Sequence, residues 1–203
     1  MRTLRTVKAY YEARAREYDD WVYGTGLFAD RDRSGWHEER ESMERAVAAM
    51  TPARTLDIAC GTGWLTQHLP GEITGLDASP SMLEVAAERI PDAEFLTGDA
   101  LDLPFEDGSF ERIATGHFYG HLEEDDRVRF LAEARRVAAE LVVIDSALHE
   151  GVEPVEWQER VLNDGSRWEV YKRYFVAGEL ADELGGDVLF DGNWFVVVRS
   201  RAA

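Results

Sequence analysis

The chain has 203 residues, 45% hydrophobic and 31% charged, which suits a globular protein with a substantial core. A net charge of −18 with no visible basic patch argues against DNA or RNA as a partner, because phosphates require a positive field. No apolar run approaches the roughly 20 residues that span a bilayer, so we expect no membrane partner. The single cysteine excludes an intrachain disulfide, and no apolar signal segment opens the chain, so we expect a cytoplasmic protein.

The first fifty residues are expected to form a helical cap. Apolar residues recur at helical spacing over 4–20, which predicts an amphipathic helix. A glycine-containing loop follows over 22–36. A second helix is predicted over 37–50, ending before Thr51-Pro52.

The middle of the chain alternates short apolar runs with helical patterns. The predicted strands are 54–59, 72–78, 93–99, 110–118 and 140–148. The predicted helices are 62–69, 79–90 and 124–139. This alternation predicts a doubly wound, Rossmann-like α/β sheet with mostly parallel strands.

The last third has a different pattern. Helices are predicted over 153–165 and 178–184, and a terminal hairpin over 187–200 that turns at 191–193. We expect one domain over 1–203, with a cap (1–50), a core that binds the cofactor (54–148), and a substrate-side insertion with the terminal hairpin (149–203).

Two glycines one residue apart stand in LDIACGTGW, at the end of the first core strand. Gly61 and Gly63 permit a sharp turn or the close approach of a ligand. In an open α/β sheet, ligands bind beyond the carboxyl ends of the strands, where this turn lies. Asp77 ends the next strand, where a carboxylate can accept hydrogen bonds from ribose hydroxyls.

A dinucleotide fingerprint would need a third glycine, but Thr66 stands at that position. Asp57, just before the turn, would repel a pyrophosphate and favour a cation. Asp99, at the end of the third strand, could accept a hydrogen bond from an adenine amino group. Together these residues predict a nucleoside ligand that carries a positive charge and no phosphate.

Four stretches in order carry a family resemblance: LDIACGTGW, GLDASPSML, GDALDLPF and the segment after ATGHFYGHL. With them the sequence resembles the class I S-adenosylmethionine-dependent methyltransferases, closely over 54–148 and more loosely elsewhere. The resemblance implies a seven-stranded sheet with an antiparallel last strand. It also implies S-adenosylmethionine as the cofactor and S-adenosylhomocysteine as its product.

The resemblance further implies which residues meet the cofactor. The turn should face its methionine part, Asp77 the ribose, and Met82 the adenine, with two tyrosines on a lid helix. The expected cofactor-binding set is Tyr11, Tyr18, Asp57, Ala59, Cys60, Gly61, Gly63, Asp77, Ala78, Met82, Asp99, Ala100, Leu101 and Gly116.

His117 and His121 follow the fourth strand, on the side where a substrate should approach. A hydroxyl acceptor needs a base, and an imidazole with an ordinary pKa near 6.5 suits that role, His117 first and His121 second. Their spacing lacks the further ligands of a zinc site, so no metal is expected.

The acceptor is expected to be a small molecule with an O- or N-nucleophile, bound between the loop 22–36 and the insertion 150–176. Aromatic residues of these segments should line it: Trp21, Tyr23, Phe28, Trp36, Trp157, Trp168, Tyr171, Tyr174 and Phe175. The alternatives are a regulator that binds S-adenosylmethionine without catalysis, and a nicotinamide-dependent oxidoreductase. A monomer and a homodimer both remain open.

Overall fold

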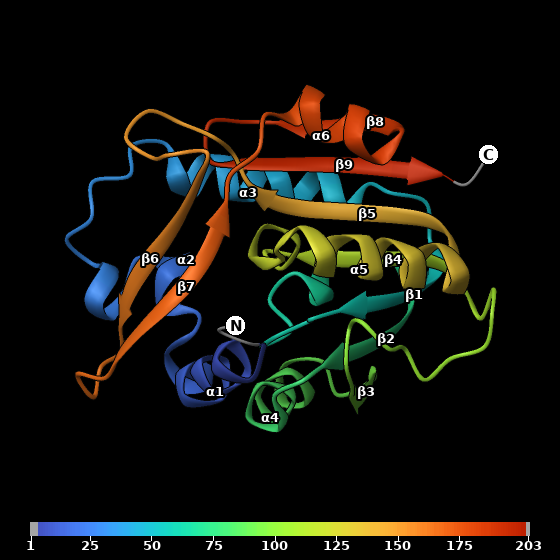
Figure 1. Cartoon of the computed structure of the whole chain (residues 1–203), viewed down its shortest axis with the longest axis horizontal. Helices are drawn as coiled ribbons and strands as arrows, with labels where there is room; N and C mark the ends of the chain where they lie inside the picture. Colours follow the sequence, from blue (N-terminus) through green and yellow to red (C-terminus); the bar gives the residue numbers. More distant parts are fainter. Residues whose placement is uncertain (1–3, 202–203) are drawn as a thin grey trace.

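A seven-stranded sheet runs through the centre of the molecule, in the strand order β3-β2-β1-β4-β5-β9-β8 (Figure 1). The computed structural model describes residues 4–201, with side chains from residue 8 onward. The strands are β1 Ala53–Ile58, β2 Gly71–Asp77, β3 Glu94–Thr97, β4 Phe110–Gly116, β5 Ala138–Ser146, β8 Gly186–Asp191 and β9 Phe195–Arg201. β1 to β5 pair in parallel, and β9 pairs antiparallel with both β5 and β8. The predicted Rossmann-like sheet with a terminal hairpin is confirmed.

The helices also follow most of the predicted order. They are α1 Leu4–Arg14, α2 Asp20–Tyr23, α3 Trp36–Ala48, α4 Pro80–Arg89, α5 Glu124–Val137 and α6 Ala177–Leu184. The first predicted helix is broken, because the short 3-10 turn Ala15–Glu17 follows α1. None of the helices described is long and apolar enough to cross a membrane. The division into one domain with three parts stays a prediction.

β5 shows why its apolar run is continuous. Leu141 and Val143 belong to the core cluster that contains residues of α5 and α6. Val142 and Ile144 belong to the second cluster, which contains residues of α3. Successive side chains of a strand point to opposite faces, so a strand covered on both faces is apolar throughout.

The helix predicted over 62–69 is wrong. Only a single 3-10 turn, Thr66–His68, forms there. Pro70 cannot continue a helix, and β2 begins at once with Gly71, so too few residues remain to repay helix nucleation. Trp64, Leu65 and Leu69 are nevertheless buried against the sheet and fill the space that a helix would cover.

The helix predicted over 153–165 is also wrong, because the segment is a strand. β6 (Val155–Val161) pairs antiparallel with β7 (Arg167–Arg173). Burial along β6 alternates residue by residue, a period of two that outweighs the helical preference of its glutamates. Asn163-Asp164-Gly165 supplies the turn, with the Gly165 N–H bonded to the Leu162 carbonyl. Figure 1 shows this hairpin beside α1 and α2, beyond the carboxyl ends of β1 and β5.

The start of β2 depends on a glycine. Gly71 has φ +112°, and a Cβ there would lie 2.2 Å from the Ala53 carbonyl oxygen of the paired strand. Gly71→Ala should therefore destabilise the fold by about 2 kcal/mol or more, from backbone strain and a clash with the main chain. Gly178→Ala in α6 is the control, since a Cβ there would have no atom within 4 Å and alanine favours a helix. Urea unfolding measures both, and similar midpoints would contradict this account.

Candidate active site

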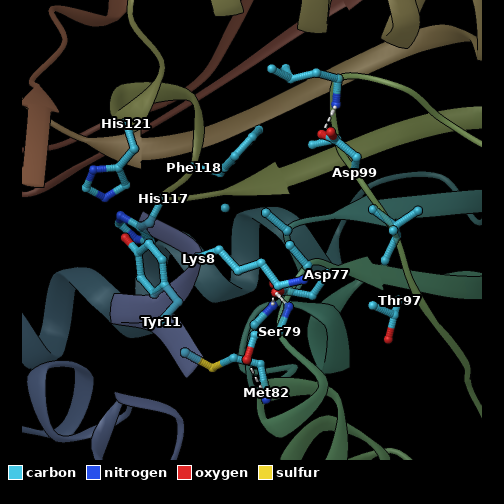
Figure 2. Close-up of a pocket in the computed structure, with 18 of the residues that line it drawn as sticks. Lys8, Tyr11, Asp77, Ser79, Met82, Thr97, Asp99, His117, Phe118 and His121 are labelled. Carbon is cyan, nitrogen blue, oxygen red and sulfur yellow. Dashed lines mark hydrogen bonds between the residues drawn. The ribbon is translucent and has the colours of Figure 1, made fainter. Parts of the chain in front are cut away.

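A cavity of about 410 Å³ opens beyond the carboxyl ends of β1, β2 and β4 (Figure 2). Most of the predicted site residues line it: Tyr11, Tyr18, Ala59, Gly61, Asp77, Ala78, Met82, Asp99, Ala100, Leu101, Gly116, His117 and His121. Figure 2 places Tyr11 and the two histidines on one side and Asp99 at the opposite end. These residues are far apart in the sequence. They meet because the carboxyl ends of parallel strands lie at one edge of the sheet.

Three predicted residues lie elsewhere. Gly63 does not line the cavity; its Cβ would meet Ala86 of α4 at 3.2 Å, so this glycine permits close packing. Asp57 and Cys60 line a separate hollow of about 20 Å³. That hollow shares Tyr18, Ala59, Gly116 and His117 with the main cavity and so adjoins it.

Asp77 joins the glycine turn to the start of α4. Its Oδ2 accepts the Gly61 N–H at 2.9 Å, and its Oδ1 accepts the Ser79 N–H at 2.8 Å. Ser79 in turn caps α4, since its hydroxyl oxygen accepts the Met82 N–H at 3.2 Å. Burial raises the pKa of Asp77, while these N–H donors lower it. A carboxylate can accept about four hydrogen bonds, so this one can still bind hydroxyl groups in the cavity.

Asp57 is 2% exposed, and its Oδ2 accepts the Thr66 hydroxyl at 2.6 Å. Burial raises the pKa of Asp57 to about 7; the hydrogen bond from Thr66 opposes this rise, and the nearby Asp77 carboxylate adds to it. Asp99 stands in a different setting, exposed at the cavity's far end, where it accepts the Leu101 N–H at 2.9 Å.

Two acids that the sequence analysis missed fasten the cap to the core. Glu12 of α1 accepts hydrogen bonds from the hydroxyls of Ser79 and Ser81 at the start of α4. Asp19 accepts the Thr62 hydroxyl at 2.6 Å and forms an ion pair with Arg89. The sequence feature that could have predicted the Glu12 contact is the Ser-Pro-Ser start of α4, because free N–H and O–H donors at a helix N-terminus attract a carboxylate. α1 therefore lies as a lid, with Lys8 and Tyr11 in the cavity wall.

His117 has the left-handed φ of +53° at the end of β4. Its ring lies 4.7 Å from the ring of Trp21 and 5.9 Å from that of Trp64, centroid to centroid. Its Nε2 is buried and has no hydrogen-bond partner among the described residues. Burial lowers the pKa of His117 to about 4.

His121 is fixed by the hairpin. Its Nδ1 lies 2.6 Å from the Tyr171 carbonyl oxygen, so Nδ1 carries the proton and Nε2 has a free lone pair. Burial lowers its pKa to about 3. The expectation of an ordinary histidine pKa is thus wrong at both positions, since burial disfavours the charged ring. Within residues 4–201 no three His, Cys, Asp or Glu side chains gather as a metal site would require.

A second cavity, of about 160 Å³, lies between the cap and the β6–β7 hairpin, where the acceptor was expected. Of the predicted aromatic residues, Trp21, Phe28, Trp36 and Tyr174 line it. The others do not: Tyr23, Trp157, Trp168, Tyr171 and Phe175. Tyr11, Tyr18, His117 and His121 line both cavities, so the two spaces meet at these residues.

The second cavity holds a cluster of basic side chains that no pattern in the sequence shows. The second cavity is also lined by Arg14, Arg31, Arg33, Arg160 and Lys172. These residues come from α1, the loop after Phe28, and the two strands of the hairpin. These residues are scattered along the sequence, and only the tertiary fold brings them together.

Residues 55–140 match a family model described as a methyltransferase domain. Over the whole length, the chain superposes on the DhpI–SAH complex with a TM-score of 0.72 and 25% identity, covering 98% of this chain and 97% of that one. Residues 55–140 therefore resemble a methyltransferase domain, and the fold is that of the class I S-adenosylmethionine-dependent methyltransferases. A DhpI–SAM–HEP complex gives the same TM-score at 24% identity, covering 97% and 96%.

Curated methyltransferases match a shorter part. A demethylmenaquinone methyltransferase of Thermotoga maritima is 42% identical over 103 residues, 48% of this chain and 44% of the relative. One of Staphylococcus aureus is 36% identical over 107 residues, with the same shares. The chain thus aligns with less than half the length of these relatives.

The lid should depend on Glu12. Glu12→Gln removes the charge that accepts from both serines, so S-adenosylhomocysteine should bind roughly three- to tenfold more weakly, the effect of a lost charged hydrogen bond at a half-exposed site. Calorimetric titration measures this affinity. Glu84→Gln, an exposed position on α4, is the matched control and should bind as the wild type does. Equal affinities for all three proteins would contradict the lid.

Because His117 is neutral in the fold, it lowers the stability of the protein at acidic pH. Its pKa is about 4 in the fold against 6.5 when exposed, so between these values the unfolded chain binds more protons and stability falls as the pH falls. The loss from this group reaches roughly 3 kcal/mol at pH 4. His117→Asn, which tolerates the left-handed backbone, should show a shallower decline of the urea midpoint from pH 6.5 to 4.5. His37→Asn on the exposed face of α3 should retain the wild-type slope, and a His117→Asn slope that matches it would contradict the burial effect.

Proposed function

We propose that the chain transfers a methyl group from S-adenosylmethionine to a small-molecule acceptor by in-line displacement. The arrangement of the two connected cavities carries this proposal. The larger one offers a carboxylate at the glycine turn and another at its far end, and the smaller one opens beside the histidines. A cofactor in the first can therefore present a group to an acceptor in the second.

The residues of the larger cavity fit S-adenosylmethionine. Asp77 has acceptor capacity left for ribose hydroxyls, and Asp99 stands where the edge of an adenine would end. The wall between them is apolar, with Met82, Ala100 and Leu101. Lys8 is the only cation in the described wall, and the glycine turn has an acid beside it, so the cavity lacks the means to hold a pyrophosphate.

Asp57 suits the methionine end. It is buried without a cationic partner among the described residues, in the hollow that adjoins the cavity at Ala59 and Gly116. An ammonium group reaching this hollow would stabilise the ionised carboxylate, and its pKa would fall from about 7. Gly61 keeps the approach open, since a Cβ there would meet only Tyr18, at 3.9 Å.

Bound S-adenosylmethionine supplies an electrophilic methyl group and a neutral sulfur leaving group. The chain's task is to hold the nucleophile in line, roughly 3 Å from the methyl carbon, and to exclude water. Tyr11 and Tyr18 close the junction of the cavities from the lid side. A hydroxyl acceptor would lose its proton to Nε2 of His117 or, second, of His121, both of which are neutral at pH 7.

The names of the curated relatives suggest a quinone-type acceptor. The family match covers residues 55–140, and within that range only His117 and His121 line the second cavity. The similarity to these methyltransferases thus concerns the residues around the larger cavity, and it gives little information about the acceptor. The reaction subclass, the choice between an O- and an N-nucleophile, the assembly state and the cytoplasmic location stay predictions.

The test is calorimetric titration with S-adenosylhomocysteine, with NADH as the control ligand. We expect the first alone to bind. Asp77→Asn should weaken it by roughly 1.5–3 kcal/mol, because hydrogen bonds to a charged group are lost. Asp92→Asn, exposed in the turn after α4, should change nothing. Binding of NADH would favour the oxidoreductase, and tight S-adenosylhomocysteine binding without transfer across a broad panel of acceptors would favour the regulator.

A further inference from the structure

The second cavity concentrates positive charge in an acidic protein. We call it the arginine pocket, after Arg14, Arg31, Arg33 and Arg160, which line it together with Lys172. The chain has 40 acidic residues against 22 basic ones, yet no aspartate or glutamate is among the described residues that line this pocket. The pocket is therefore positively charged although the chain as a whole is negatively charged.

The arginines are not held by carboxylates. Within the described part of the chain, no ion pair joins any of the four to an acid. Arg14 is 6% exposed; its Nη1 donates to the Tyr10 hydroxyl at 2.8 Å, and its Nη2 is buried without a partner there. Arg160 donates to Gln158, and its buried Nε is likewise unpartnered. Buried guanidinium groups with spare donors are costly unless something accepts from them.

The remaining cations do not relieve this charge. Arg33 donates to the Trp21 carbonyl at 2.6 Å and stacks on Trp36, and Arg31 lies over the ring of Phe28. Burial lowers the pKa of Arg31, and Arg160 lowers it further through repulsion. Lys172 alone has an acid, Asp145, at 2.6 Å. The four guanidinium charges therefore stand uncompensated in one small space.

The position of the pocket suggests what its positive charge could bind. It meets the larger cavity at Tyr11, Tyr18, His117 and His121. A molecule that reaches this junction with its nucleophile would place its other end among the arginines. Guanidinium groups present planar pairs of donors that match the two oxygens of a carboxylate or a phosphoryl group.

We propose that the methyl acceptor carries an anionic oxygen headgroup, a carboxylate or a phosphoryl group, that binds in the arginine pocket. This inference rests on the proposed methyl transfer. A volume of about 160 Å³ and the aromatic walls Trp36 and Tyr174 limit the acceptor to a small molecule. A neutral quinone would leave the guanidinium charges uncompensated.

The test titrates the chain, saturated with S-adenosylhomocysteine, with inorganic phosphate and separately with acetate. Trp21, Trp36 and Trp194 line the pocket, so tryptophan fluorescence reports occupancy beside calorimetry. We expect saturable binding of at least one anion, weakened at least tenfold in Arg31→Gln and in Arg160→Gln. The anion that binds more tightly distinguishes a phosphoryl from a carboxylate headgroup.

Arg129→Gln on α5 is the matched control, because it removes one charge from an exposed position outside the pocket. Arg31 is itself exposed, so its variant should fold, which the thermal midpoint checks. Normal S-adenosylhomocysteine binding with no anion binding would overturn the anionic acceptor and leave methyl transfer standing. So would equal weakening in Arg129→Gln. A wild-type chain that binds no S-adenosylhomocysteine would overturn the proposed function itself.

Discussion

The ion pair between Lys172 and Asp145 holds the β6–β7 hairpin against the central sheet. The ammonium nitrogen lies 2.6 Å from Oδ1 of a carboxylate that is wholly buried. Asp145 also accepts the N–H groups of Gly120 at 2.8 Å and of Ser146 at 2.8 Å. One carboxylate therefore joins β5, the turn after β4 and the β6–β7 hairpin. The cost of removing two charges from water is offset only because these additional donors satisfy the carboxylate.

Both histidines depend on this arrangement. His121 bonds the carbonyl of Tyr171, the residue just before Lys172 in β7. His117 has its Nδ1 3.9 Å from Asp145 and its N–H bonded to the Ile144 carbonyl at 2.8 Å. Its left-handed backbone costs energy by itself and persists because the neighbouring aromatic rings and strand over-determine its position. Because His117 and His121 line both cavities, their fixed positions hold the two cavities in a constant relative position.

The strands of the central sheet and the turns at their ends were predictable because their signals are local. The apolar strands, the glycine turn, Asp77 and the Ser79 cap each follow from a few neighbouring residues. The hairpin was missed because its alternation of polar residues competes with their helical preference. The arginines were missed for another reason. Arg14 and Arg160 are far apart in the chain, and no local pattern marks side chains that only tertiary packing unites.

The contrast between an acidic exterior and the arginine pocket affects how a charged molecule would enter. At a distance an anion meets the repulsion of a chain with net charge −18, and only near the opening does attraction take over. Added salt screens the outer field first, since the Debye length is about 10 Å at 0.1 M. For an anionic acceptor, salt would thus speed association while it weakens the equilibrium grip, so rate and affinity would respond to ionic strength in opposite directions. The acidic surface would thus slow the association of an anion, whereas the pocket by itself would only strengthen its binding.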